Sequence, residues 1–299
     1  MFPAVLTTIL FAFSALTARR SIAYVGSQRA NFGRQCIAFV VLALWAHLFG
    51  QAAGPTFLLF FFSGMLGFGF GDWAYYEAMP RIGPALSMLL CQCLAAPIAA
   101  VTEWLCLGTR MSGIQIASSG VILAGVAMAL APGKGEPVPI GHRVLGCFFG
   151  VMAACGQAWG AVTARFGFQR AHALGFSIDG LSSAYQRLLG GMVCIGVLVL
   201  AHGLHSRWRG HDKQGFKPDW GRAWPWATGN AVIGAVLGVS CYNWALKSSP
   251  SAVVLPIVAT SPLCVMLLTF ATEGLMPRRR AIVGAVLAVI GVIILVRNA

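Results

Sequence analysis

Asp72 and two tyrosines form the group of residues in this sequence that is best suited to chemistry. They occur in GFGFGDWAYYEAMPRIG, residues 67–83, within a run rich in Phe, Leu and Gly. On a helix, Tyr75 and Tyr76 lie on the same side as Asp72, which predicts an aromatic wall beside an acidic group. Such a carboxylate binds a cationic group of a ligand or carries a coupling proton, and a purely structural hydrogen bond is the alternative.

The depth of each acidic residue decides how much its charge costs. The apolar stretch from about Pro55 to Met79 has its middle four residues before Asp72, so Asp72 lies about 6 Å from that point, whereas Glu77 lies about 13 Å away and reaches the interface. A charged aspartate near the bilayer centre costs about 2.5–3.5 kcal/mol. Asp72 therefore needs a polar cavity, a partner or a proton. Glu103 ends its stretch near a loop, where water or Arg110 is expected to meet its charge.

The elements that must position these residues are membrane-spanning helices. Of the 299 residues, 58% are hydrophobic and 10% are charged, and the mean hydropathy is +0.77. This composition indicates an integral, multi-pass membrane protein. Lipid offers no partner for backbone polar groups, so each of ten apolar stretches is predicted to be a helix. They are 2–18, 35–51, 55–79, 84–105, 113–131, 144–164, 181–201, 223–246, 252–272 and 281–296.

The chain repeats itself once. SALTARRSI from Ser14 resembles GAVTARFGF from Gly160, and YYEAMPRIGPA from Tyr75 resembles YNWALKSSPSA from Tyr242. Five spans in each half place the second copy upside down relative to the first. We therefore expect an all-α integral membrane protein of ten transmembrane helices, built as two five-helix inverted-topology repeats. The repeats cover residues 1–131 and 144–299, and 132–143 connect them.

The repeat provides no second copy of the acidic residue. The offset between Tyr75 and Tyr242 is 167 positions, and the same offset places Val239 opposite Asp72. The repeated scaffold therefore does not require a charge at this position. This absence favours a role of Asp72 toward the cargo or its coupling proton, with a structural hydrogen bond as the alternative.

The chain resembles the drug/metabolite transporter superfamily, of the ten-span type with two EamA-like halves. The resemblance rests on the Ala-x-Thr-Ala-Arg helix ends, the Tyr-x-x-Ala turns, the mid-span prolines and the closing helices with Gly125 or Gly291. A Trp-Gly pair common in the first span of the family is replaced by Phe13-Ser14, although Trp159-Gly160 keeps it in the sixth. The resemblance implies a central cargo site between the halves and substrates such as amino acids, amines and sugars.

Two sets of residues are candidates for that central site. Polar and aromatic residues within the spans are expected to bind the substrate, with helix-to-helix hydrogen bonds and interfacial belts as the alternatives. Prolines within spans are expected to open the helices and act as joints, with a packed kink as the alternative. The substrate set is Asp72, Tyr75, Tyr76, Gln92, Gln157, Trp159, Tyr242, Asn243 and Thr260, and the joint set is Pro97, Pro256 and Pro262.

The predicted function is secondary transport, by export or exchange, of a small organic metabolite such as an amino acid or an amine. The sequence has no ATP-binding loop, no recognised set of metal ligands and no nucleophile with a base, so no cofactor, no metal and no enzyme activity are expected. A non-transporting membrane subunit and an intramembrane enzyme remain the alternatives. The partners are a small-molecule substrate and the lipid bilayer, with a coupling proton as one option. The oligomeric state is not indicated.

The charge distribution bears on partners and orientation. The net charge is +13, but the basic residues are spread over short loops, which fits anionic head groups and membrane orientation rather than nucleic acid. With alternate loops on opposite faces, 15 of the 21 Lys and Arg residues, Arg34 among them, lie on one side. The positive-inside rule then predicts external termini, whereas the resemblance implies cytoplasmic ones. A bacterial cytoplasmic (inner) membrane is the expected location.

Overall fold

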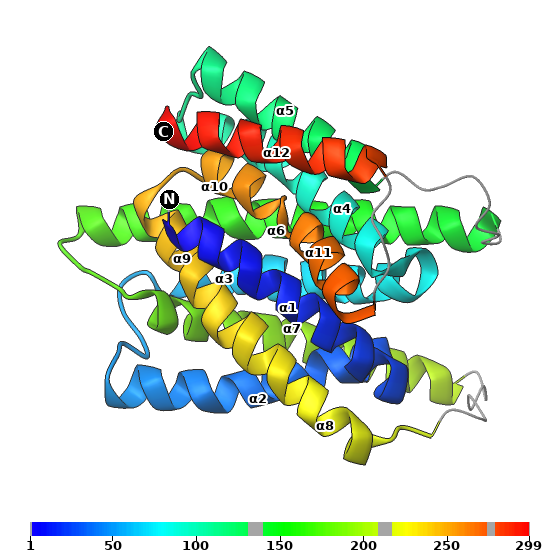
Figure 1. Cartoon of the computed structure of the whole chain (residues 1–299). Coiled ribbons are helices and arrows are strands. Elements are labelled where there is room, and N and C mark those ends of the chain that lie inside the picture. Colours follow the sequence, from blue (N-terminus) through cyan, green and yellow to red (C-terminus); the bar gives the residue numbers. More distant parts are fainter. Residues whose placement is uncertain (1, 131–139, 209–216, 274–278, 299) are drawn as a thin grey trace.

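The chain folds into helices that follow the predicted order. A computed structural model describes residues 2–130, 140–208, 217–273 and 279–298, and its regular elements in these ranges are helical (Figure 1). The predicted connection at 132–143 falls largely outside these ranges. Seven helical stretches in the described residues are long and apolar enough to span a membrane, and two shorter apolar helices are Gly113–Met128 and Ile282–Leu295. The chain is an all-α, multi-pass membrane protein.

The two halves contain corresponding elements, except that α4 of the first half corresponds to three shorter helices, α9, α10 and α11, in the second. The first half consists of α1 (Phe2–Val25), α2 (Ser27–Leu48), α3 (Phe57–Gly64), η1 (Met65–Gly71), α4 (Asp72–Leu107) and α5 (Gly113–Leu130). The second consists of α6 (Ile140–Ala173), α7 (Gly180–Trp208), α8 (Trp220–Gly229), η2 (Asn230–Gly238), α9 (Val239–Ser248), α10 (Ser251–Val258), α11 (Ser261–Glu273) and α12 (Arg279–Arg297).

The third span of each half contains a π-helical segment at the same place. In the first half η1 lies between α3 and the start of α4, and in the second half η2 lies between α8 and α9. A π-helical turn widens the helix and often occurs at functional sites. The third and fourth spans of the first half meet within α4 at Gly83, whose φ of 80° suits glycine.

The two halves interlock. The first helix of each half packs on the third span of the other half: α1 contacts α8, η2 and α9, while α6 contacts α3, η1 and α4. The last helices, α5 and α12, lie side by side at one edge of the bundle (Figure 1). This exchange of partners agrees with two inverted repeats that share one centre.

Glycines make the contact between η1 and α6 exceptionally close. A Cβ atom added to Gly156 would lie 2.6 Å from the Cα atom of Gly71, and one added to Gly160 would lie 3.0 Å from that of Gly67. Backbones approach this closely only where side chains are absent. Glycines four residues apart on each helix therefore serve helix packing here. These four residues are named the glycine seam below.

Glu103 is buried and bonds to a helix start, which corrects the expectation that water or Arg110 meets its charge. It is 1% exposed and accepts hydrogen bonds from the Ser251 hydroxyl and, at 3.1 Å, from the amide of Ala252. These donors lie in the first turn of α10, where free backbone amides attract a carboxylate. Glu103 therefore ties the end of the fourth span to the start of the ninth.

Candidate functional site

A cavity lies between the two halves of the bundle. It has a volume of about 100 Å³, and its walls come from α1, α2, η1 and α4 of the first half and from α6, α7, η2 and α9 of the second. Its lining residues are Phe11, Ser14, Ala15, Ala18, Arg34, Gly67, Phe68, Asp72, Tyr75, Tyr76, Met88, Cys91, Gln92, Gln157, Arg187, Gly234, Val239 and Tyr242. The cavity is thus shared by the two repeats, as a central site requires.

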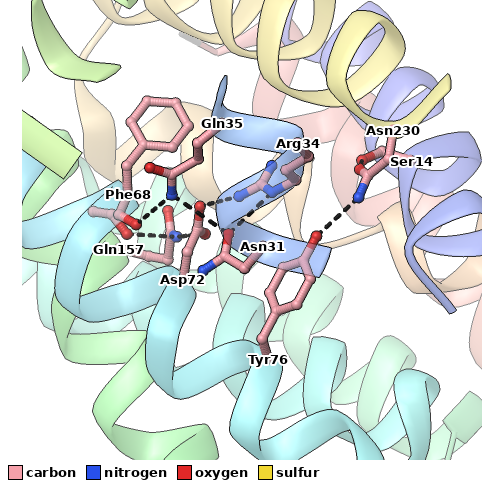
Figure 2. A network of polar contacts seen from close by, with 10 residues as sticks. Ser14, Asn31, Arg34, Gln35, Phe68, Asp72, Tyr76, Gln157 and Asn230 are labelled. Atoms are coloured by element: carbon pink, nitrogen blue, oxygen red, sulfur yellow. Dashed lines mark hydrogen bonds and ion pairs between the residues drawn. The ribbon is translucent and has the colours of Figure 1, made fainter. Parts of the chain in front are cut away.

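Asp72 has a cationic partner inside the protein. Arg34, on α2, forms an ion pair with Asp72, which is the first residue of α4 after the π-helical turns of η1. The side-chain amide of Gln157 donates a hydrogen bond of 3.1 Å to the same carboxylate (Figure 2). Arg34 Nε also donates to the Asn31 side-chain oxygen at 3.2 Å. The charge of Asp72 is therefore met by Arg34 in this conformation.

A second set of hydrogen bonds lies beside this pair. The Ser14 hydroxyl donates to the Asn230 side-chain oxygen at 2.6 Å, and the Asn230 amide donates to the Tyr76 hydroxyl at 2.8 Å (Figure 2). The Tyr76 ring also lies 5.3 Å from the Arg34 guanidinium, within cation–π distance. These contacts join α1 and η2 to α4 across the repeat boundary and hold Tyr76 in place.

Arg187, on α7, is the other arginine of the cavity wall. It is 3% exposed, and its Nη1 atom donates to the Asn243 side-chain oxygen at 2.5 Å. The guanidinium carbon lies 5.6 Å from the centre of the Phe68 ring and 5.8 Å from that of Tyr242. The Arg187 Nε atom is buried and has no hydrogen-bond partner. Arg187 is therefore held by rings and one amide, not by a carboxylate.

The two arginines occupy equivalent positions in the repeats. Arg34 is seven residues from the start of α2 at Ser27, and Arg187 is seven residues from the start of α7 at Gly180. Their surroundings differ at two equivalent positions.

The first difference is the residue that follows the π-helix, Asp72 in one half and Val239 in the other. The second is on the first helix of each half, where the repeat places Phe11 opposite Gln157. Both of these apolar residues line the cavity. Asp72, which pairs with Arg34, and Gln157, which bonds to Asp72, thus have apolar counterparts on the cavity wall.

Most of the predicted substrate residues meet in the cavity. Asp72, Tyr75, Tyr76, Gln92, Gln157 and Tyr242 line it, and Asn243 stands behind the lining as a partner of Arg187. Whether they bind a substrate stays a prediction.

Two predicted residues lie outside the cavity. Trp159 is 43% exposed and borders a separate shallow pocket on the outside of α4 and α6. It follows the inward-facing Gln157 by two residues, about 200° around the helix. The Thr260 hydroxyl donates to the backbone oxygen of Ile257 at 2.7 Å, at the break between α10 and α11.

The three prolines differ in their surroundings. Pro97 is exposed on α4, and the non-helical backbone inside α4 is at Gly83. Pro256 is buried within α10, and Pro262 is buried at the second position of α11, just after the helix is interrupted at residues 259–260. The ninth span is thus interrupted next to Pro262, whereas the fourth span continues through Pro97. Whether these prolines act as joints stays a prediction.

Sequence reasoning missed the two arginines as site residues. Hydropathy begins the second span at Gln35, so Arg34 was assigned to a loop, although α2 already begins at Ser27 and buries it. Arg34 therefore does not belong in the loop charge count. The signal that could have found it is the repeat itself, which aligns Arg34 with Arg187 inside an apolar stretch.

The charged side chains of the cavity wall define what it can bind. They are Arg34, Arg187 and Asp72, which leaves one positive charge in excess when the ion pair is counted as neutral. Aromatic rings and Met88 supply the apolar part of the wall. In the described residues, no group of three or more His, Cys, Asp or Glu side chains is arranged to hold a metal ion. The wall therefore suits a small organic molecule with a polar or charged group.

Comparisons with known proteins identify the family. A solved crystal structure aligns over 99% of this chain and 98% of its own length, with a TM-score of 0.74 and 16% sequence identity, which is a likeness of fold. A comparison with curated proteins finds no match. The model of the EamA-like transporter family matches residues 1–131 and again 145–297. The chain, with its two repeats around one cavity, therefore belongs to the EamA-like transporter family.

Proposed function

We propose that this protein is a secondary transporter that exports or exchanges a small organic metabolite, such as an amino acid or an amine. Its location in this proposal is the bacterial cytoplasmic membrane. The repeat units 1–131 and 144–299, joined by 132–143, rock against each other and expose the central site to one side of the membrane at a time. The observation that carries the proposal is the cavity lined by both halves with charged and aromatic side chains.

Contacts between the halves close one end of the cavity in this proposal. Glu103 on α4 bonds to the start of α10, and the Thr8 hydroxyl of α1 contacts the Ile257 backbone oxygen at 3.2 Å. Both contacts join different repeats, so both must break when the transporter opens on that side. The break between α10 and α11, next to Pro262, provides a joint for this movement.

Asp72 has one of two roles in transport under this proposal. It carries a coupling proton, or it exchanges Arg34 for a cationic group of the cargo. Either role requires the ion pair with Arg34 to open during the cycle. A permanent pair that only stabilises the fold is the structural alternative.

Two other functions compete with transport. A non-transporting membrane subunit does not explain why a polar cavity lies between the halves. An intramembrane enzyme requires a nucleophile with a base and an orienting partner, and the hydrogen bonds of the cavity wall join amides, hydroxyls and an ion pair instead. Membership of a transporter family also favours transport over both.

Counterflow in proteoliposomes tests the proposal. Vesicles preloaded with one metabolite of an amino acid and amine panel should take up the labelled form of it faster than vesicles without protein. Asp72→Asn should abolish uptake or its pH dependence, and Asp219→Asn, outside the cavity, should change neither. No uptake over the panel together with covalent turnover of one compound would overturn the proposal, and wild-type uptake by Asp72→Asn at all pH values would remove both roles of Asp72.

A further inference from the structure

The Arg187 guanidinium has no carboxylate partner. In the described part of the chain, ion pairs join Arg34 to Asp72, Arg81 to Glu77 and Arg222 to Asp219, and none includes Arg187. Arg187 is nevertheless 3% exposed and lines the cavity. Buried charges in membrane proteins are normally paired or face a water-filled site, so an arginine at the cavity wall without a direct ion-pair partner points to an anionic ligand.

One edge of this guanidinium is left for hydrogen bonds. Nη1 is occupied by Asn243, whereas Nε is buried without a partner and no described group accepts a hydrogen bond from Nη2. Nε–H and one Nη2–H point in parallel, which is the fork that binds the two oxygens of a carboxylate. The unused donors therefore fit a planar anion better than a single neutral acceptor.

The surroundings of Arg187 hold this fork in place. Phe68 and Tyr242 lie at cation–π distance from the guanidinium and fix its position. The Nη2 atom lies beside Gly67, where an added Cβ atom would be only 3.2 Å away. Gly67 also lines the cavity, and the absence of its side chain lets the guanidinium pack closely against the η1 backbone.

The other half of the protein shows what is missing beside Arg187. Around Arg34 the protein itself provides a carboxylate from Asp72 and an amide from Gln157. At the positions equivalent to Asp72 and Gln157, Val239 and Phe11 line the same cavity. A ligand carboxylate at Arg187 would form an ion pair there like the one that Arg34 forms with Asp72.

We propose that Arg187 binds the carboxylate of the cargo, which makes the substrate a small organic acid, free or as part of an amino acid. This inference rests on the proposed transport function, and of the two substrates named there it favours an amino acid over an amine. A simple amine offers nothing to Arg187, and it can reach Asp72 only by displacing Arg34. The cavity volume of about 100 Å³ restricts the part of the molecule that enters this conformation to a small one.

Thermal unfolding with matched ligands tests the inference. The purified full-length protein is titrated at constant ionic strength with propionate against propionamide, benzoate against benzamide, and leucine against leucinamide. We expect the acid of at least one pair to raise Tm in a saturable way while its amide does not. Arg187→Gln should weaken this binding at least tenfold. Arg165→Gln is the matched control, because Arg165 bonds to the Leu246 backbone oxygen, and Arg165 is absent from the cavity wall.

A second variant and a second measurement keep the test decisive. Arg187→Lys retains the charge without the planar fork and should weaken binding by about tenfold. Acid binding that survives Arg187→Gln and Arg187→Lys unchanged, or no preference for any acid over its amide, would overturn the inference. Counterflow separates this failure from failure of the transport proposal. Uptake of amines alone would support transport and contradict the role of Arg187. Acid binding that depends on Arg187, without uptake of any compound, would support the role of Arg187 and contradict transport.

Discussion

The surroundings of Arg34 and Arg187 differ although the repeat places the two residues in equivalent positions. Arg34 pairs with the Asp72 carboxylate and bonds to Asn31, whereas among the described residues Arg187 bonds to the Asn243 side chain alone. The positions equivalent to Asp72 and Gln157 hold Val239 and Phe11 on the cavity wall. Each arginine is buried at the same depth of its helix and lies near aromatic rings. The scaffold thus supplies two similar cationic sites, and one of them alone is neutralised by the protein.

This difference separates the needs of the fold from those of the ligand. If buried arginines were required for assembly of the halves, both would be expected to have an internal counter-charge, because an unpaired buried charge opposes folding. The first half meets this requirement with Asp72. The described part of the second half provides no paired carboxylate for Arg187, which lies at the cavity wall, where a ligand can supply the counter-charge.

Removing each arginine in turn should give very different losses of stability. Arg34→Met leaves Asp72 unpaired within the bundle, which should lower the free energy of unfolding by about 3–5 kcal/mol. Arg187→Met leaves no carboxylate behind and should stay within about 1 kcal/mol of the wild type, because the lost Asn243 contact is offset by the loss of a buried charge. Thermal unfolding in one detergent measures both.

The double variant Arg34→Met/Asp72→Leu serves as the control. It removes both charges and should recover most of the stability lost in Arg34→Met, since replacing a buried ion pair by apolar residues is often neutral. Equal losses in Arg34→Met and Arg187→Met would mean that the two sites are equivalent after all, against the comparison drawn here.

Adding the missing acid should convert the second site into a copy of the first. In Val239→Asp the new carboxylate occupies the position equivalent to Asp72 and competes with the cargo for Arg187. We expect the Kd of a bound organic acid to rise at least tenfold, about 1.4 kcal/mol. Titration by thermal unfolding measures the change. Val239→Asn introduces a side chain of the same shape as aspartate but without its charge, and it should raise the Kd much less. Equal increases in Kd for the two variants would show that the loss of space, not the charge, is responsible.

The helix starts that precede the two arginines also differ, with a smaller expected effect. Asp179 accepts hydrogen bonds of 2.8 Å from the amides of Leu181 and Ser182 at the start of α7, whereas α2 begins after Gly26 without a side-chain cap. Asp179→Ala should therefore lower the free energy of unfolding by about 0.5–2 kcal/mol.

The pH dependence of this contribution follows from the Asp179 carboxyl group. Burial alone would raise its pKa, but hydrogen bonds from the Ser182 hydroxyl and amide and the Leu181 amide outweigh burial and hold the pKa below its usual range. Because the folded-state pKa is the lower one, the stabilisation is present above the unfolded-state pKa of about 3.9 and is lost as the pH falls through the folded-state value. The difference in Tm between wild type and Asp179→Ala should therefore shrink below about pH 4; a constant difference would contradict the assignment.

The sequence was sufficient for the scaffold because its signals are repeated. Hydropathy and the offset of 167 between Tyr75 and Tyr242 predict the spans, the two repeats and the absence of an acidic counterpart to Asp72. The structure confirms the all-helical fold with two repeats, and it places Asp72 and Val239 at the same point after their π-helices. Backbone satisfaction in lipid leaves few other folds for such a composition.

The partners of the charged residues could not be predicted from the sequence. A span predicted from hydropathy ends at the nearest charged residue, and Arg34 was therefore placed outside its helix. Hydropathy also contains no information about ion pairs between helices, such as that of Arg34 with Asp72. Glu103 was misread for the same reason, since its partners belong to α10, far along the chain. Trp159 shows a further limit, because the side of a helix that faces the cavity depends on packing with the other repeat.

The glycine seam has a consequence for how this protein can diversify. Gly156 and Gly160 lie so close to Gly71 and Gly67 that one methyl group would separate η1 from α6. These positions tolerate almost no variation. Val239 and Phe11, by contrast, line the cavity and take no part in the contact between η1 and α6. A substitution at either position can therefore change the cavity wall while the contact between the two repeats is kept.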